Sequence, residues 1–461
     1  MKSVFFAAIW LIIFIKQLLF WLWLWQLKEY HRGRFKAHFE AQKIRKIASS
    51  FWRLKYPKFT KKIIFLFLIC FLAEILLILY FSFVWVIILT IIFIPLIFLS
   101  FQIPSAIWRK ILINKAEEKR LKFKNLLVIG ITGSFGKTST KEFLAAILSE
   151  KFSENKILKT KENQNSEVGI SQCVLNNLKP EHEIFVCEMA AYNRGGIKLL
   201  CDIAKPKIGI LTGINEQHIA TFGSQENIIK TKYELIESLP RSQPQVVLRG
   251  LPIDTMAFFN ARNKYCLELY QKTPHQNKFG TGQAKIRKFL YGENATFFGE
   301  ENILGAIAVA KELGMQEEEI SKAVERIENK FSGIQIKKGI NGLNIIDATY
   351  SANPDGVIAH LEYLKSFSGR RVIVMPCLIE LGKVSKEIHR RIGKKIAEVC
   401  DLAIITTKDR FKEIREEAGE KTIFMESPNK IFEKIKNFCQ SGDVILLESR
   451  VPQELINLLK V

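Results

Sequence analysis

Two long runs of apolar residues dominate the first quarter of the chain. Residues 4–27 are interrupted only by Lys16 and two glutamines, and residues 63–103 contain one charge, Glu74. Because a membrane-crossing helix needs about 20 apolar residues, the first run predicts one span and the second a hairpin of two. A re-entrant or interfacial hairpin is the alternative for the second run. A cleaved signal peptide fits less well, since the first run is long and lacks a small-x-small cleavage site.

From Leu126 onward the pattern changes. Short apolar runs typical of buried strands alternate with stretches of helical periodicity, which indicates a doubly wound α/β protein. The expected strands are 126–129, 184–187, 208–212, 245–248, 343–346, 372–375, 402–406 and 444–447. The expected helices are 141–149, 228–238, 303–313, 317–327, 355–365, 385–399 and 429–438. Residues 251–291 show no clear pattern and are expected to be irregular.

A domain boundary is expected near residues 333–342, where two helical stretches end and a new strand begins. The chain then divides into a membrane region, residues 1–120, a central domain, residues 121–332, and a smaller α/β domain, residues 333–461.

Charge refines the picture of the membrane region. Residues 28–62 contain twelve Lys or Arg against two Glu, and five more basic residues lie within 109–120. By the positive-inside rule both segments are expected on the cytoplasmic side of a multi-pass cell-membrane protein, with the N-terminus outside. The basic residues suit membrane lipids or an anionic lipid-linked substrate better than nucleic acid, although they could serve topology alone. The eight cysteines are scattered and indicate neither a zinc ribbon nor a disulfide framework.

A glycine-rich segment follows the first strand of the α/β part. Residues 132–139 read Thr-Gly-Ser-Phe-Gly-Lys-Thr-Ser, and helical periodicity follows at 141–148. A strand that enters such a loop and then a helix is typical of a phosphate-binding loop, in which backbone N–H groups hold phosphates. The usual pattern has another glycine where Ile131 stands, so the segment fits a subfamily of that motif.

The residue types in this loop predict a site for a nucleoside triphosphate. Lys137 is expected to reach the terminal phosphates and Thr138 to ligate Mg²⁺. The residues expected to bind the nucleotide are Gly133, Ser134, Phe135, Gly136, Lys137, Thr138 and Ser139.

Three further residues are candidates for the same chemistry. Glu188 closes a predicted strand, where a Mg²⁺ ligand is expected beside a phosphate loop. His218 also follows a strand, and Lys232 lies fourteen residues later on a predicted helix. A lone histidine or lysine is usually structural, so each of these residues alone is a weak signal.

The order of these motifs resembles the Mur ligases. The resemblance rests on residues 132–142, on Thr160 to Gly169, on Glu188-Met189, on His218 and Phe222-Gly223-Ser224, and on Lys232-Tyr233-Glu234. It continues in Ile346 to Pro354, in Ile379-Glu380-Leu381-Gly382 with His389, and in Gly442-Asp443-Val444 leading to Ser449-Arg450. It covers about residues 123–461 and is strongest for the branch that adds D-alanyl-D-alanine to a UDP-N-acetylmuramoyl-tripeptide.

The resemblance implies a central P-loop ATPase domain and a C-terminal Rossmann-like domain that act as an ATP-dependent acid–amino-acid ligase. ATP would convert a carboxylate into an acyl phosphate, which an amine then attacks. The implied catalytic residues are Lys137, Glu188, His218 and Lys232. Thr138 and Glu188 would hold one Mg²⁺, and His218 and a carbamylated Lys232 a second.

The resemblance also implies contacts with the other ligands. Asn302 and Asp347 would contact the nucleotide, and the residues that would bind the substrate are Asn163, Asn165, Tyr350 and Asn353. The expected partners are a cell-wall precursor and an amino acid or short peptide.

Several positions depart from the family pattern. Residues 301–305 keep one asparagine of the motif near the adenine, Asp347 is followed by Ala348, and Ser351 replaces an asparagine. The arginine usual between Phe331 and Lys338 is missing, so Lys337 or Lys338 would substitute, and the Lys-Gly-Ser near the C-terminus is here Leu447-Glu448-Ser449.

The membrane region stands where relatives have a module that holds uridine diphosphate, which suggests a lipid-linked acceptor. Two alternatives remain: an ATP-binding membrane assembly factor without ligase activity, and a ligase that acts on a carboxylate outside wall synthesis.

Overall fold

The computed structural model describes residues 2–27, 56–80, 86, 102–161, 164–240, 246–274, 286–296, 299–328, 336–349 and 353–460. The chain forms two compact units, Met1–Ile113 and Asn114–Val461.

Two apolar helices make up most of the described part of the first unit, α1 (Lys2–Leu27) and α4 (Lys61–Tyr80). They pack through a small cluster that includes Phe14 and Leu18 of α1 and Ile63 and Leu66 of α4. By length and composition, one described helical segment, Ile63–Tyr80, could cross a membrane, and Trp10–Leu24 is a shorter apolar helix. The first two predicted spans therefore correspond to helices, whereas most of the third lies outside the described residues.

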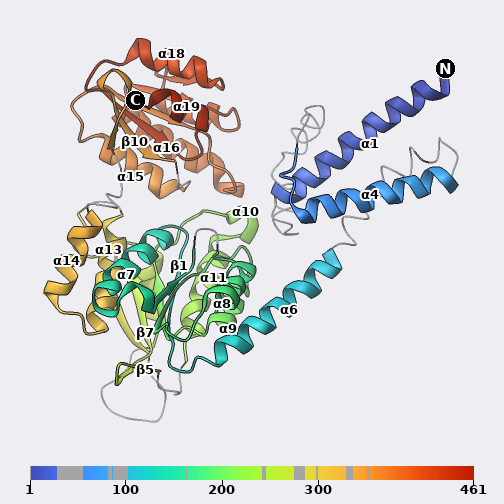
Figure 1. The fold of residues 1–461 in the computed structure, drawn as a ribbon. Coiled ribbons are helices and arrows are strands. Elements are labelled where there is room, and N and C mark those ends of the chain that lie inside the picture. The colour runs from blue at the N-terminus through green and yellow to red at the C-terminus, as the bar shows by residue number, and fades with distance from the viewer. Residues whose placement is uncertain are drawn as a thin grey trace. The chain divides into compact units, whose positions relative to one another are not determined.

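A six-stranded parallel sheet forms the centre of the middle domain (Figure 1). Its strands, in spatial order, are β2 (Ile157–Lys159), β3 (Ile184–Glu188), β1 (Leu127–Thr132), β4 (Ile208–Leu211), β7 (Met256–Asn260) and β8 (Arg287–Tyr291). Strands β1, β3, β4 and β7 are buried along their whole length. This burial explains their uninterrupted apolar sequences, because a parallel strand covered on both faces has no solvent side.

Helices cover both faces of this sheet. One face packs against α7 (Lys137–Phe152), α13 (Glu300–Glu312) and α14 (Glu317–Glu328), which share a core with the strands. The other face packs against α9 (Gly196–Ala204) and α11 (Gln225–Glu237), with α8 (Glu167–Asn177) beside α9 (Figure 1). The middle domain is therefore doubly wound, as the alternating pattern predicts.

The expectation of an irregular segment at residues 251–291 is wrong. This segment contributes two strands of the main sheet, β7 and β8, the helix α12 (Lys264–Lys272), and β6 (Leu251–Ile253), which pairs with β5 (Val246–Leu248). Strand β8 lies at the sheet edge with a mixed, half-buried sequence, so it shows neither an apolar run nor alternation. The helix α12 is too short for periodicity to identify it.

The C-terminal domain has a second six-stranded sheet. Its strands, in spatial order, are β13 (Thr422–Phe424), β12 (Leu402–Ile405), β11 (Arg371–Met375), β14 (Val444–Glu448), β10 (Asn344–Ala348) and β9 (Ile336–Lys338). All pairs are parallel except the edge pair of β9 and β10. One face packs against α15 (Pro354–Leu364), α16 (Ser385–Val399) and α17 (Phe411–Ala418), and the other against α18 (Pro428–Phe438) and α19 (Gln453–Leu459).

Every strand and helix expected from the sequence has a counterpart in the structure, with shifts of a few residues at the ends. The expected boundary at residues 333–342 lies partly outside the described residues, and β9 begins at Ile336. The helix α6 (Gln102–Leu121) joins the second apolar run to the middle domain. All eight cysteines are free thiols, and all but the half-buried Cys439 are buried.

Candidate functional site

The candidate residues of the middle domain meet at the carboxyl edge of its sheet. Strand β1 leads into the glycine-rich loop, β3 ends at Glu188, and β4 precedes Asn215 and His218. Strand β1 lies between β3 and β4, so its two neighbours in the sheet both follow it in the chain. Ligands of open α/β sheets bind at such a switch point, beyond the carboxyl ends of the strands.

The loop between β1 and α7 is tightly packed against the segment after β4. The Ser134 amide donates to the Gly213 carbonyl at 2.6 Å. A Cβ at position 133 would lie 2.1 Å from Oγ1 of Thr212, and Gly136 has a φ of +80°, which disfavours side chains other than hydrogen. The Lys137 amine donates to the carbonyls of Gly133 at 2.9 Å and Ser134 at 3.1 Å. The lysine therefore folds back over the loop that it follows.

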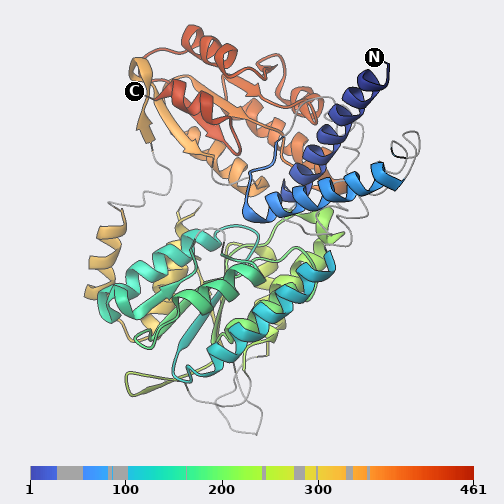
Figure 2. The same ribbon diagram turned by 45° about the vertical axis from the view of Figure 1, so that its right-hand side comes forward.

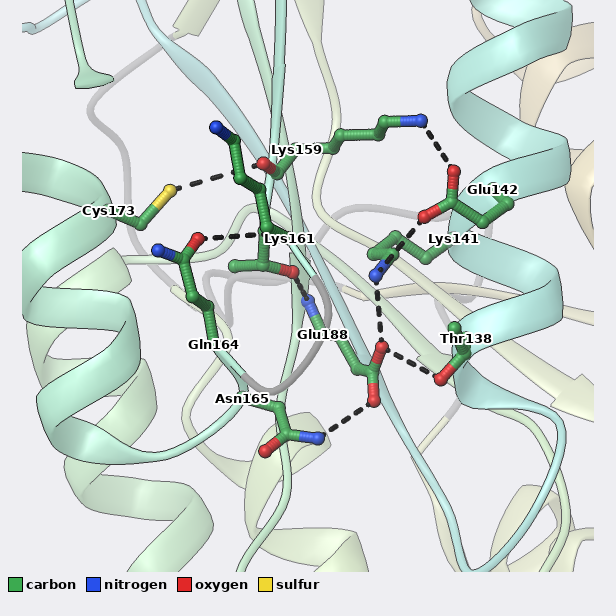
Figure 3. A network of polar contacts seen from close by, with 10 residues as sticks. Thr138, Lys141, Glu142, Lys159, Lys161, Gln164, Asn165, Cys173 and Glu188 are labelled. Atoms are coloured by element: carbon green, nitrogen blue, oxygen red, sulfur yellow. Dashed lines mark hydrogen bonds and ion pairs between the residues drawn. The ribbon is translucent and has the colours of Figure 1, made fainter. Parts of the chain in front are cut away.

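Glu188 is the centre of a polar network at this edge (Figure 3). Its carboxylate accepts hydrogen bonds from the Thr138 hydroxyl at 3.0 Å, the Asn165 amide at 2.9 Å and the Lys141 amine at 3.2 Å. Its backbone amide donates to Oγ1 of Thr160 at 3.0 Å. The first turn of α7, the end of β3 and the loop before α8 thus converge on one carboxylate.

The charges around Glu188 keep it ionised. Burial by itself would raise the pKa of the Glu188 carboxyl, but the positive charge of Lys137, the hydrogen bond from Asn165 and the amine of Lys141 outweigh it and lower the pKa. Burial lowers the pKa of Lys137, and Glu188 opposes that shift. An ionised carboxylate beside a threonine hydroxyl offers two oxygen ligands of the kind that Mg²⁺ prefers.

His218 lies at the start of α10 (Ile219–Phe222) with a φ of +68°. Its Nδ1 atom contacts the carboxylate of Glu380, and Tyr192 lies edge-on to its ring at 5.2 Å between centroids. Burial lowers the pKa of the imidazole, although Glu380 works in the opposite direction. A neutral imidazole that uses Nδ1 to donate to a carboxylate has Nε2 as its basic nitrogen.

Lys232 lies on α11 and is buried, with 3% of its surface exposed. Its amine lies 5.8 Å from the centre of the Phe222 ring. Burial and the nearby charge of Lys137 lower the pKa of this amine to about 7. Lys137 and Lys232 also lower the pKa of His218. Lys137, His218 and Lys232 therefore lie near one another, and the positive charge of Lys137 would suit an anionic ligand.

The arrangement fits a nucleotide with bound metal ions. Among the described residues, no group of three or more His, Cys, Asp or Glu could hold a metal by itself. Thr138 and Glu188 would hold Mg²⁺ together with phosphate oxygens, because phosphates usually complete such sites. Lys137 would have to exchange its hydrogen bonds to the carbonyls of Gly133 and Ser134 for a phosphate oxygen.

A cavity of about 390 Å³ adjoins the loop at Phe135. Asn260, Arg262 and Tyr265 line it from the middle domain, and Asp355 and Arg391 from the C-terminal domain. Asn215 also lines it and donates to Oδ1 of Asn353 and Oδ2 of Asp355, both at 3.1 Å. The cavity is large enough for a ligand with a flat ring, in the size range of small-molecule sites.

Other residues expected to bind ligands are divided between the two domains. Asn302 is buried, and its Oδ1 accepts a hydrogen bond from Thr140 at 3.3 Å, next to Gly136. Asp347 lies in β10 of the C-terminal domain, one residue before the strand ends, and accepts hydrogen bonds from Thr349 and from Lys337 at 3.2 Å. Asn163 and Tyr350 lie outside the described residues.

Three residues to which the sequence analysis gives no role contact the predicted site residues. Lys141 is fully buried against Glu188, Glu380 contacts His218, and Asn215 joins Asn353 to Asp355. The sequence signals were weak. Lys141 follows the phosphate loop directly, and Glu380 lies in a family motif, but nothing in the chain predicts their partners.

Two family models match the chain. Residues 131–310 match the Mur ligase middle domain, and residues 334–450 match the glutamate ligase domain of Mur ligases. Together the two matches span more than half of the chain.

Two relatives are named UDP-N-acetylmuramoyl-tripeptide–D-alanyl-D-alanine ligase. The protein of Synechocystis sp. is 32% identical over 285 residues, which are 58% of this chain and 59% of that protein. The protein of Bacillus subtilis is 28% identical, over 59% of this chain and 60% of that protein. The chain thus matches about three fifths of the length of these curated relatives.

Solved structures agree in fold. MurF from Acinetobacter baumannii gives a TM-score of 0.64 at 22% identity, covering 76% of this chain and 80% of that one. MurF ligase from Thermotoga maritima, solved in complex with ADP, gives 0.59 at 24% identity, covering 76% and 83%. With its middle and C-terminal domains matched both in sequence and in fold, the chain belongs to the Mur ligase family.

Proposed function

We propose that this protein is an ATP-dependent ligase that joins an amino acid or short peptide to a carboxylate of a cell-wall precursor. The observation that carries the proposal is the convergence of Lys137, the Thr138–Glu188 pair, His218 and Lys232 on one sheet edge. The names of the matched relatives support the reaction class and suggest a muramoyl-peptide acceptor and D-alanyl-D-alanine as the amine.

The first step of the proposed reaction transfers a phosphoryl group. A carboxylate oxygen of the acceptor attacks the γ-phosphorus of ATP, the bond to the β,γ-bridging oxygen breaks, and ADP leaves. Such a transfer depends mainly on positioning and charge neutralisation. Lys137 would neutralise the terminal phosphates, and Thr138 and Glu188 would hold a Mg²⁺ that supplies further positive charge there.

The second step forms the amide. The amine attacks the acyl carbon, loses a proton, and inorganic phosphate leaves with the electrons of the acyl–oxygen bond. His218 and a carbamylated Lys232 would hold a second Mg²⁺, whose chemistry is to supply positive charge for the phosphate group. A pKa near 7 suits Lys232 for this role, because CO₂ reacts with the neutral amine and leaves an anionic carbamate and a proton.

We further propose that the acceptor is lipid-linked and that the ligase domains lie at the cytoplasmic face of the cell membrane. The support is a helix of sufficient length and apolar character, Ile63–Tyr80, and the basic segment at residues 28–62. By the positive-inside rule that segment faces the cytoplasm.

The test compares the full chain with Lys137→Ala in detergent. ADP release is measured with a UDP-linked or a lipid-linked muramoyl peptide as acceptor and with D-alanyl-D-alanine or single amino acids as amine. The parent should form a product of the expected mass, and Lys137→Ala should lose at least about 100-fold in turnover. Equal background turnover by both proteins with every pair would refute the ligase. Turnover with only the UDP-linked acceptor would refute the lipid-linked substrate.

A further inference from the structure

The C-terminal end of α6 is fixed to the middle domain (Figure 2). The buried guanidinium of Arg120 donates to the carbonyls of Ala204 at 2.9 Å, Phe123 at 2.8 Å and Leu126 at 3.1 Å. Lys119 donates to the carbonyl of Leu175 at 2.9 Å. Burial lowers the pKa of Arg120 to about 10, so the group stays charged at neutral pH. The last turn of α6 is therefore part of the ligase fold.

The N-terminal half of the same helix presents apolar side chains to solvent. Ile107, Trp108 and Ile111 are 57%, 54% and 49% exposed. Residues three and four apart are neighbours on a helix surface, so Ile111 lies beside both Trp108 and Ile107 and joins them into one face. Ile113 and Ala116, on the opposite side, are buried. Large exposed apolar patches of this kind mark surfaces that meet a partner or a membrane.

Basic residues flank this apolar face. Lys110 and Lys115 are exposed, and Lys115 lies two turns after Trp108 on the same side of the helix. Arg109 is next to Trp108 in the chain. Tryptophan is enriched at membrane interfaces, and lysine can extend its charge toward headgroups while its alkyl chain covers apolar surface. This combination is complementary to a negatively charged lipid surface rather than to an apolar protein groove.

We propose that the N-terminal half of α6 lies on an anionic phospholipid surface. Ile107, Trp108 and Ile111 enter the headgroup region, and Lys110 and Lys115 pair with anionic headgroups. The inference rests on the membrane attachment proposed above and adds a second, peripheral contact, made by the helix that enters the ligase fold. Such interfacial helices bind through buried apolar area together with electrostatic attraction.

The experiment uses the full chain in vesicles of phosphatidylcholine, with or without phosphatidylglycerol, and measures amide hydrogen exchange at residues 105–118. The second readout is quenching of Trp108 emission by brominated lipid, taken as the difference between the parent and Trp108→Phe. With anionic lipid, exchange should slow by about five-fold for each basic residue that meets the surface. Trp108 should also be quenched more strongly.

The basic flank is tested with the double variant Lys110→Glu and Lys115→Glu, which should lose both effects. The matched control is the double variant Lys122→Glu and Lys124→Glu, which makes the same charge change just beyond the helix. It should keep both the slower exchange and the stronger quenching of Trp108. Equal exchange with and without anionic lipid would overturn the proposal. Slower exchange that depends on protein concentration would also overturn it, because the apolar face would then contact a second copy of the chain. Failure of the protein to float with any vesicle would instead refute membrane attachment itself, and ADP release reports separately on the ligase.

Discussion

The Nδ1 atom of His218 contacts the carboxylate of Glu380, which approaches from the loop between β11 and α16. The backbone reinforces this contact, because the Ala220 amide donates to the Glu380 carbonyl at 3.1 Å. A residue of the C-terminal domain thus orients a histidine of the middle domain. Carboxylates that hold the second nitrogen of a metal-binding histidine fix its ring and its tautomer.

Glu380→Ala should therefore lower ligation by about 10- to 100-fold, the usual cost of losing such a partner. ADP binding should change by less, because the contacts described for Glu380 are with His218 and Ala220. Glu380→Gln keeps an acceptor oxygen, so its ligation rate should lie between those of the parent and Glu380→Ala. Titration of activity with Mg²⁺ and calorimetry of ADP binding separate these effects. Glu387→Ala, an exposed change on α16, is the control, and unchanged turnover in Glu380→Ala would contradict the orienting role.

Lys141 and Glu188 form a buried ion pair in which the lysine is fully buried. Lys141→Met should lower the melting temperature, because removing one partner of a buried pair costs about 3 to 5 kcal/mol. Lys141 is one of the groups that lower the pKa of Glu188 from 4.5, so the loss should be full at pH 7 and should shrink as the pH falls below 4.5. Adding Glu188→Gln to Lys141→Met should restore part of the stability. Additive losses in this double-mutant cycle, followed by thermal melts, would show that the two residues are not coupled.

The lowered pKa of Lys232 makes a prediction about stability and pH. The folded protein binds a proton on this amine only below about pH 7, whereas the unfolded chain binds it up to about pH 10.5. The unfolded state therefore binds more protons between these values, and stability rises with pH across this window. Lys232→Met removes the buried amine. Its melting temperature should exceed that of the parent at pH 6, with a smaller difference at pH 9, although ligation is lost.

The reverse pH trend, or no difference between Lys232→Met and the parent at pH 6, would show that the amine is not destabilised by burial. Thermal melts at a series of pH values, with and without bicarbonate, provide the measurement. Bicarbonate should stabilise the parent and leave Lys232→Met unchanged, because only the parent can form the carbamate.

Alanine substitutions at Gly136 and Gly195 can separate backbone strain from steric contact. Both have φ near +80°, but a Cβ at position 136 would lie 2.3 Å from Oδ1 of Asn302, whereas nothing lies within 4 Å at position 195. Gly195→Ala should cost about 1 kcal/mol through backbone strain alone. Gly136→Ala should lower stability further and weaken ADP binding, and Asn302→Gly should recover part of the stability. Equal melting temperatures for the two alanine variants would contradict this packing.

Most of the fold could be predicted because its strands are buried on both faces. β1, β3 and β4 are continuous apolar runs, and helices such as α14 and α16 carry apolar residues at helical spacing along one side. Strands β7 and β8 were missed for a different reason. Strands β7 and β8 have five residues each and α12 has nine, too few for a pattern of apolar positions to identify them. In β8, at the sheet edge, four of the five residues are half-buried, so apolar and polar residues do not alternate.

The sequence predicts those site residues whose position follows from the order of strands and loops along the chain. A strand-end acid such as Glu188 can be expected beside a phosphate loop, and here Thr138 donates to it directly. Glu380 is 162 residues from His218 and comes from another domain, so no local pattern could join them. Lys141 reads as an ordinary helix lysine, because nothing in its neighbours indicates that its amine is buried.

The burial of the cysteines has a practical consequence for spectroscopy. Burial raises the pKa of Cys201, Cys266 and Cys400 to about 12, so these thiols hold little of the reactive thiolate at neutral pH. A cysteine introduced at an exposed position such as Lys383 should react with a maleimide much faster. The native chain can therefore serve as the background for paired spin labels, which would test whether the distance between the middle and C-terminal domains changes when ATP is added.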